Sequence, residues 1–298
     1  MHKDLYDTYT LALDKGSKYY PTSLKSIKNP PRVLYVKTKD PENLSSIFKN
    51  CVGIVGSRKM SLYGSRVTAK LFNELSKDIT VVSGFMYGVD TKALETALDK
   101  GIKTIGILPC GIDKCHPAGN HKLYKNILTA GGLIISENPD NFDALKWSFP
   151  KRNRIIAGLC KVLIVIEAKP ASGTLITANY SNEFDRPVYA VVTDIFNETM
   201  QGNMQILQSF AKPLFSGYQI NESLNLSGIS PSLPIEGLQH VELSPLETSI
   251  LDSLKQRPST IDQLNLKICI SMTKLITAVN MLALKGTIKE SGGYFYVV

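Results

Sequence analysis

Short apolar runs alternate with amphipathic segments through the middle of the chain. The apolar runs lie at residues 52–55, 80–82, 104–108, 133–135, 162–166 and 188–192. Between them, apolar residues recur at helical spacing in segments 61–76, 88–99, 121–130, 151–159 and 174–184. Strands that are buried on both faces appear as continuous apolar runs, and helical crossovers join them when they are parallel. The pattern therefore predicts an α/β fold with a doubly wound, mainly parallel, extended Rossmann-like sheet.

Both ends of the chain depart from this alternation. Residues 1–50 are a polar extension rich in Lys and Pro, with one short strand predicted at 33–36. Residues 221–242 are rich in Ser, Asn, Gly and Pro, which predicts a linker after a Rossmann-like domain spanning 1–220. Residues 243–298 resume order, with helices predicted at 245–256, 260–266 and 272–285 and a hairpin around Gly292. Three helices and a hairpin in this order predict a small winged-helix domain.

Charge and cysteine usage narrow the class of protein. The 298 residues carry a net charge of +8, which favours an acidic partner such as nucleic acid. The five cysteines are odd in number and scattered, so we expect reduced thiols rather than a disulfide framework. No apolar stretch follows Met1, and no run approaches the ~18 residues of a membrane helix. We therefore expect a soluble, cytoplasmic protein.

Small and hydroxylated residues follow several of the predicted strands. Ser57 and Arg58 follow the first strand, Ser83 and Gly84 the second, and Ser172-Gly173-Thr174 the fifth. In a doubly wound sheet these strand ends share one edge, where ligands bind. Small residues let backbone N–H groups approach an anion, and a helix N-terminus adds partial positive charge. Turn formation and capping explain any one loop, but three on one edge beside arginines favour an anion site.

The segment from Lys146 to Arg154 has the most marked composition in the chain. It holds four cations, no acid, the only Trp and a Phe in the run Lys-Trp-Ser-Phe-Pro-Lys-Arg-Asn-Arg. Arginines grip phosphates with two parallel hydrogen bonds, and an adjacent aromatic ring stacks on an unpaired base. A solvated charged face with a buried Trp is the alternative interpretation. The segment predicts the centre of a basic site for a phosphate-bearing ligand.

Several enzyme classes and metal sites lack their required spacing. There is no GxGxxG, no GxxxxGK[ST] and no GxSxG around Ser83. Cys110, Cys115 and His116 lack a second ligand cluster for zinc, so we expect no metal, no cofactor and no catalytic residue. One enzyme remains as the alternative, a Rossmann-like nucleotide phosphoribohydrolase with a Gly-Thr loop. Its expected glutamate is missing here, because Glu183 lies more than two helical turns beyond that loop.

Taken together, these motifs resemble those of the DprA/Smf family over roughly residues 19–217. The most specific is the run Phe-Pro-Lys-Arg-Asn-Arg-Ile-Ile-Ala-Gly-Leu from Phe149 to Leu159. The others are Val55–Arg58 with Tyr63-Gly64, Ser83–Asp90, Cys110–Asp113 with His116-Pro117, and Glu167-Ala168 with Ser172–Ala178. Three features depart from the family pattern. Too few residues precede the match for a full N-terminal SAM-like domain, Thr193-Asp194 replaces a usual glycine, and Cys115-His116 stands where an aromatic is common.

The resemblance implies a non-enzymatic protein that binds single-stranded DNA. Such proteins take up incoming strands in natural transformation, help load RecA onto them, and form homodimers through the Rossmann-like domain. The residues expected to contact DNA are Ser57, Arg58, Ser83, Gly84, Lys146, Phe149, Lys151, Arg152, Asn153, Arg154, Ser172, Gly173 and Thr174. The winged-helix tail is only weakly basic, so contact with double-stranded DNA and docking to a protein are equally plausible for it.

Overall fold

The computed structural model describes residues 8–226, 243–284 and 287–297. The chain divides into two compact units, Met1–Ile229 (unit 1) and Ser230–Val298 (unit 2). Most of the predicted linker, residues 227–242, lies outside the described residues. Residues 221–223, where the predicted linker begins, are helical instead, because helix α9 (Tyr218–Ser223) runs across the predicted boundary at 220. Ile220 and Asn221 are buried there, so unit 1 continues beyond that boundary.

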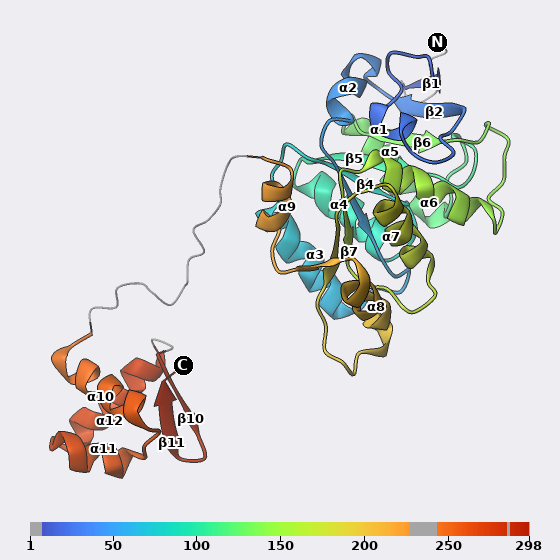
Figure 1. The fold of residues 1–298 in the computed structure, drawn as a ribbon. Coiled ribbons are helices and arrows are strands. Elements are labelled where there is room, and N and C mark those ends of the chain that lie inside the picture. Colours follow the sequence, from blue (N-terminus) through green and yellow to red (C-terminus); the bar gives the residue numbers. More distant parts are fainter. Residues whose placement is uncertain (1–7, 227–242, 285–286, 298) are drawn as a thin grey trace. The chain divides into compact units, whose positions relative to one another are not determined.

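Unit 1 is built on one nine-stranded sheet in the order β1-β2-β6-β5-β4-β3-β7-β8-β9 (Figure 1). Strands β3 to β9 are parallel to one another. At one edge β2 runs antiparallel to β6, and the outermost strand β1 runs antiparallel to β2 and so in the direction of the parallel strands. The strands are β1 Tyr9–Asp14, β2 Val33–Thr38, β3 Cys51–Val55, β4 Thr80–Ser83, β5 Lys103–Ile107, β6 Leu133–Ser136, β7 Val162–Val165, β8 Val188–Val191 and β9 Lys212–Leu214. This confirms the predicted doubly wound, mainly parallel sheet.

Helices cover both faces of the sheet. Successive residues of each central strand point to opposite faces, so each strand contributes side chains to two apolar cores. In β3, Val52 and Ile54 enter one apolar core, and Cys51 and Val55 enter the other. The first core is closed by α3 (Leu62–Glu74), α4 (Val89–Asp99), α5 (His121–Thr129) and α9. The second is closed by α1 (Thr22–Lys25), α2 (Leu44–Ile47), α6 (Ser148–Leu159), α7 (Gly173–Glu183) and α8 (Gln201–Ser209). Short 3₁₀ turns at Pro41–Asn43, Ala118–Asn120 and Glu198–Met200 complete the connections.

The N-terminal extension is more ordered than its composition suggests. Beyond the predicted strand, it supplies β1 and two short helices that belong to the second core. Leu24 and Ile27 pack against α6 at Gly158, where a Cβ atom would lie 2.8 Å and 2.9 Å from their side chains. The sequence pattern gives little sign of β1, because Leu13 is its single buried residue. The extension therefore helps to hold α6 against the sheet.

Unit 2 contains α10 (Pro245–Gln256), α11 (Ile261–Ile268), α12 (Met272–Leu284), β10 (Ile288–Ser291) and β11 (Tyr294–Val297). This is the order of elements expected for a winged helix. The first helix begins in a capping box, in which Ser244 and Glu247 satisfy each other's backbone N–H groups. Among the described residues, no single helix is long and apolar enough to cross a membrane. The bent pair α11–α12 reaches the required length and composition, and its Leu264, Leu275, Val279 and Leu282 are buried in the core of unit 2.

Candidate functional site

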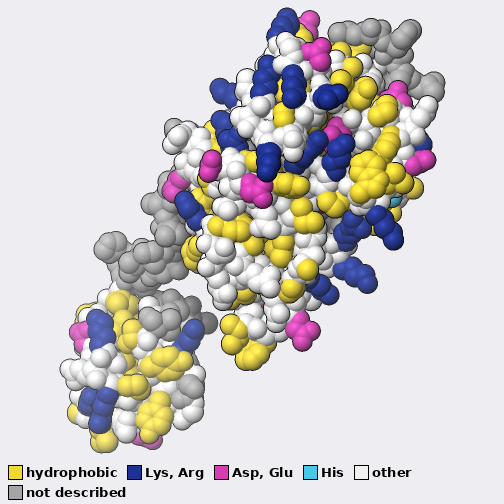
Figure 2. Space-filling view, turned by 45° about the vertical axis from the view of Figure 1, so that its right-hand side comes forward, with side chains coloured by type: hydrophobic (Ala, Val, Ile, Leu, Met, Phe, Trp, Pro, Cys, Tyr) yellow, Lys and Arg dark blue, Asp and Glu magenta, His cyan; other side chains and the backbone are white. Residues whose placement is uncertain are grey.

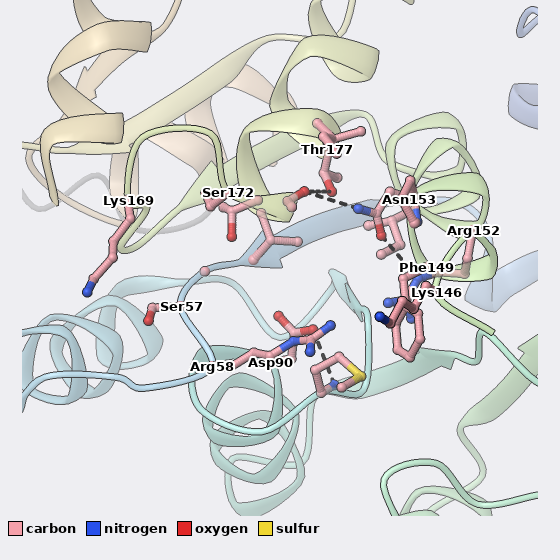
Figure 3. Close-up of a pocket in the computed structure, with 18 residues that line it drawn as sticks. Ser57, Arg58, Asp90, Lys146, Phe149, Arg152, Asn153, Lys169, Ser172 and Thr177 are labelled. Atoms are coloured by element: carbon pink, nitrogen blue, oxygen red, sulfur yellow. Dashed lines mark hydrogen bonds between the residues drawn. The ribbon is translucent and has the colours of Figure 1, made fainter. Parts of the chain in front are cut away.

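The order of the strands reverses next to β3. This strand pairs with β4 on one side and with β7 on the other, so the chain leaves β3 and β7 in opposite directions along the sheet. Such a switch point leaves a crevice outside the carboxyl ends of the strands. A pocket of about 520 Å³ lies there, between the loop after β3, the first half of α6 and the start of α7 (Figure 3). We call it the switch-point pocket.

The switch-point pocket collects most of the residues that the sequence predicts as ligand contacts. These are Ser57, Arg58, Lys146, Phe149, Arg152, Asn153, Ser172, Gly173 and Thr174. Four other predicted residues, Ser83, Gly84, Lys151 and Arg154, do not line it. The remaining lining residues were not predicted, and they include Asp90, Lys169 and Thr177. The sequence could have indicated Lys169 as a ligand contact, because it lies in the loop between the fifth predicted strand and Ser172.

The N-terminus of α7 forms one wall of the switch-point pocket. Ser172 is the N-cap residue, yet its side chain makes no capping bond, and its buried Oγ has no hydrogen-bond partner among the described residues. A Cβ atom at Gly173 would meet nothing within 4 Å, so the backbone is open to close approach. The first N–H groups of a helix have no partner within the helix, and the helix dipole adds positive potential. This wall therefore suits an anion.

Three cations line the switch-point pocket together with that wall. Arg58, Lys146 and Lys169 are exposed, and among the described residues none of them is in an ion pair. In Figure 3, Lys169 and Ser172 lie on one side of the pocket and Lys146 and Phe149 on the other, with Arg58 below them. The pocket is therefore lined with positive charge across its width, as an extended polyanion would require.

The ring of Phe149 is half-buried between two side chains. The guanidinium carbon of Arg58 lies 5.2 Å from its centroid, in cation–π range. The ring of His116 lies edge-on at 5.5 Å. Burial and both arginines, Arg58 and Arg152, lower the pKa of His116, which favours its neutral form. Phe149 lines the pocket, so it can meet a ligand while also packing within the loop cluster.

Helix α6 begins at Ser148 and not at 151, where the apolar spacing predicts its start. Pro150 therefore lies within the first turn, where its missing N–H costs no helical hydrogen bond. The Asn153 amide donates to the carbonyl of Gly173 at 3.1 Å, which ties α6 to the start of α7. Asn153 thus positions the anion-binding wall from inside the pocket.

Arg152, which the sequence predicts as a phosphate contact, has a structural role in addition to lining the pocket. Its side chain is buried, and its Nη1 donates to the carbonyl of Gly84 at 2.5 Å and to that of Ile107. Its Nε donates to Asn153 at 3.2 Å. Burial lowers the Arg152 pKa to about 10, so the guanidinium is still charged at neutral pH. Arg152 therefore joins α6 to the ends of β4 and β5, and it also lines the switch-point pocket.

Asp90 is the counter-charge of Arg152. It caps no helix by its side chain, but its Oδ2 accepts from the backbone N–H of Met86 at 3.3 Å. Burial raises its pKa to about 6, while Arg152 acts in the opposite direction. At neutral pH both groups are therefore charged and buried together. Of the described residues that line the switch-point pocket, Asp90 is the single carboxylate.

Ser83 and Gly84 also have structural uses instead of the predicted ligand contacts. The hydroxyl of Ser83 is buried and donates to the carbonyl of Ile54 at 2.6 Å. A Cβ atom at Gly84 would lie 2.7 Å from Asp90 Oδ2 and 3.0 Å from Arg152 Nη2. Glycine is needed here because the charged pair occupies that space. Ser83 and Gly84 therefore support the switch-point pocket without lining it.

Lys151 and Arg154 lie on the opposite flank of α6, away from the switch-point pocket. Arg154 Nη2 is 2.6 Å from Glu137 Oε2, and Lys151 Nζ is 3.5 Å from the same oxygen. Both line a different pocket, so the cations that the sequence predicts as DNA contacts along α6 are divided between two pockets. Helical periodicity separates the two sets, because residues 151 and 154 share one face of the helix.

Glu167, at the end of β7, holds the first loop in place. Its carboxylate accepts from the backbone N–H groups of Ser61 at 2.9 Å and Gly64 at 3.1 Å, and from the Ser61 hydroxyl. It thereby caps α3 and is used in structure rather than in the pocket. In the part of the chain that the structure describes, no group of three or more His, Cys, Asp or Glu residues is arranged to hold a metal ion.

Comparisons with known proteins agree with this architecture. Residues 12–225 match the family model of DNA recombination-mediator protein A. The chain is 37% identical to the DNA processing protein DprA of Bacillus subtilis over 210 residues, which are 70% of this chain and 69% of that protein. It is 38% identical to protein Smf of Synechocystis sp. over 206 residues, 69% of this chain, and spans about half of that relative's length (52%).

Solved structures show the same relationship. DNA processing protein A from Streptococcus pneumoniae superposes with a TM-score of 0.66 at 35% identity, covering 72% of this chain and 73% of that one. The protein from Helicobacter pylori, described for its unique single-stranded DNA binding mode, superposes with a TM-score of 0.63 at 32% identity, covering 72% of this chain and 96% of that one. Because the family model matches most of unit 1, the chain belongs to the DNA recombination-mediator protein A (DprA/Smf) family.

Proposed function

We propose that this protein binds single-stranded DNA in the switch-point pocket and acts as a recombination mediator in natural transformation. The observation that carries the proposal is the set of three exposed cations, Arg58, Lys146 and Lys169. They line the pocket together with Ser172 at the N-terminus of α7, whose buried Oγ has no hydrogen-bond partner among the described residues. A strand's phosphates would meet the cations and the helix terminus, and Phe149 would stack a base. The relative from Helicobacter pylori, described for binding single-stranded DNA, supports this ligand.

The proposal predicts a strong preference for single strands and a marked dependence on salt. Each neutralised phosphate of a single strand contributes about −0.7 to the slope of log affinity against log salt. Three cations in the pocket therefore predict a slope of about −2 or steeper. A gel shift that compares single- and double-stranded oligonucleotides across a salt series measures both quantities. Equal affinity for the two forms, or a slope near zero, would contradict the proposal.

We propose further that the pocket holds its ligand without catalysis. Glu183 is at the far end of α7, which over its 11 residues is roughly 15 Å from the Gly-Thr loop. Asp90, the carboxylate in the pocket, is buried under the electrostatic influence of Arg152 and has no second acid beside it among the described lining residues. The alternative is a nucleotide phosphoribohydrolase. Release of free base from nucleoside monophosphates at enzymatic rates would favour that alternative.

The proposed homodimer has a candidate surface on unit 1. Ile195, Phe196 and Phe215 are 71%, 85% and 68% exposed, respectively, although they are large and apolar. They belong to the segments that follow β8 and β9, and β9 is the free edge of the sheet. Exposed apolar surface of this kind is typical of protein interfaces. We propose that a second copy of the chain binds this surface.

Replacing Phe196 by Asp should therefore shift the protein from dimer to monomer in sedimentation equilibrium, with dissociation at least tenfold easier because a buried aromatic anchor is worth about 2 kcal/mol or more. Leu145→Asp is the matched control, since Leu145 is also exposed at 44% but lies in the loop before α6. A monomeric wild-type protein, or a dimer that both variants leave intact, would contradict the surface.

The proposed function also includes the contact made by unit 2, a protein partner of the full chain and a cellular location. The exposed face of α12 carries Met272, Ile276 and Met281 with Lys274 as its cation. This favours a protein contact over double-stranded DNA for unit 2.

We propose RecA as a partner of the full chain. We place both in the cytoplasm, where the five free cysteines would stay reduced. The rate of RecA filament formation on strands coated by a single-strand binding protein, with and without this protein, tests the partnership. An unchanged rate would refute it.

A further inference from the structure

A second pocket, of about 640 Å³, lies on the other flank of α6. We call it the flank pocket. Its lining includes Lys15, Arg32, Tyr35, Glu137, Lys151 and Arg154. The proposed function does not involve the flank pocket, although two cations that the sequence predicts as DNA contacts, Lys151 and Arg154, line it. Figure 2 shows Lys and Arg side chains gathered over the upper part of unit 1, at the height at which Figure 1 places β1, β2 and α1.

The register of the sheet places the flank pocket on the same edge as the switch-point pocket. Tyr35 of β2 is opposite Ser136, the last residue of β6, and Val33 is opposite Asp14, the last residue of β1. The antiparallel strand β2 therefore begins where the parallel strands end. Lys15 follows β1 and Arg32 precedes β2, so both lie at the ligand-binding edge of the sheet.

The charges in the flank pocket are unbalanced. Four cations, Lys15, Arg32, Lys151 and Arg154, line it together with one carboxylate, Glu137. Glu137 is engaged by Arg154 at 2.6 Å and by Lys151 at 3.5 Å. Lys15 and Arg32 are exposed, and neither is in an ion pair among the described residues. An anion could therefore enter without displacing an existing partner.

Arg154 supplies an independent sign of a missing ligand. Its side chain is 10% exposed, and one of its terminal nitrogens, Nη1, is buried without a hydrogen-bond acceptor among the described residues. A buried donor that lacks an acceptor is costly, and a charged donor more so. The planar guanidinium binds Glu137 through Nη2 and keeps a second donor for another oxygen, as in bidentate phosphate recognition.

We propose that the flank pocket is a second phosphate-binding pocket, and that a single strand held in the switch-point pocket continues across α6 into it. The inference rests on the proposed function. A helix with its side chains is about 10–12 Å wide, which about three stacked nucleotides span at 3.4 Å each. Trp147 lies on this route: it is 53% exposed, follows Lys146 of one pocket, and its ring centroid is 5.6 Å from Lys151 Nζ of the other.

The test compares short and long oligonucleotides of deoxythymidine, about 5 and 20 nucleotides, on the full chain. Arg32→Glu should weaken binding of the long strand about tenfold or more, since a charge-assisted contact is lost, and should make the salt slope less negative by about 0.7. Affinity for the short strand should stay at the wild-type value. Lys28→Glu is the matched control, because Lys28 is exposed and lines neither pocket.

Trp147 provides a second readout, because it is the only tryptophan of the chain. The long strand should quench its fluorescence in the wild type and less in Arg32→Glu. Long-strand affinity equal to wild type in Arg32→Glu, or an equal loss for both lengths, would overturn the inference. The inference would also be overturned if Arg32→Glu lost binding of deoxythymidine monophosphate but kept wild-type affinity for the long strand. The pocket would then be a site for free nucleotides. Failure of the wild type to bind either strand would instead refute the proposed function.

Discussion

Replacing Arg58 by Glu should weaken single-stranded DNA binding by about 100-fold, and replacing it by Ala by about tenfold. The neutral variant loses a charge-assisted contact, worth about 1.5–3 kcal/mol, and the acidic one adds repulsion against the phosphates. Arg58 is exposed at the switch-point pocket, and its guanidinium stacks at 5.2 Å from the Phe149 ring. Fluorescence anisotropy of a labelled oligonucleotide at fixed salt measures the loss.

The neighbouring Lys59 is the matched control for Arg58. It is exposed and of the same charge, but it does not line the pocket. Lys59→Glu should change affinity severalfold at most, through the long-range field, whereas Arg58→Glu acts at the ligand. Neither variant should change the melting temperature by more than a few degrees, because both side chains are exposed and Arg58 loses only its cation–π contact with Phe149, worth about 0.5–1 kcal/mol. Equal losses for the two variants would mean that the protein attracts DNA by general charge alone, without the pocket.

The fold of unit 1 was largely readable from the sequence, and the reason is local. Each central strand is buried on both faces, so it appears as an unbroken apolar run that needs no knowledge of its neighbours. The edge strand β1 lacked this signal because Leu13 alone is buried in it. The loops that form the pocket were found by the same logic, since the ends of parallel strands share one edge.

The roles of individual arginines could not be read in the same way. Arg152 and Arg154 are two positions apart in a basic run, but one binds backbone carbonyls and the other binds Glu137. The carbonyl of Gly84 is 68 residues away from Arg152 in the chain. A cation in a motif therefore indicates an anion site nearby, but only the packing of distant strands decides whether that cation is exposed. The flank pocket was missed for the same reason, as it depends on the pairing of β2 with β6.

Arg152 should be the most sensitive position for stability, because it is buried, donates to two backbone carbonyls and balances the charge of buried Asp90. Arg152→Ala leaves Asp90 buried without its counter-charge and leaves the carbonyls of Gly84 and Ile107 without their donor. A buried charge left without a nearby opposite charge, together with two carbonyls left without a donor, should cost about 3–5 kcal/mol. For a domain of this size that is a fall in melting temperature of roughly 10 °C. Thermal unfolding monitored by circular dichroism measures it.

Two further variants separate the electrostatic cause from lost packing. Arg152→Lys keeps the charge near Asp90 but has one compact donor group, so it should be destabilised less than Arg152→Ala. The double variant Asp90→Asn with Arg152→Met removes both charges and should also be more stable than Arg152→Ala, because no unpaired charge remains buried. At a temperature where Arg152→Ala is folded, it should bind single strands more tightly than Arg58→Glu does. If Arg152→Ala instead kept its melting temperature and lost DNA binding, Arg152 would have to leave its carbonyl partners and grip phosphate itself.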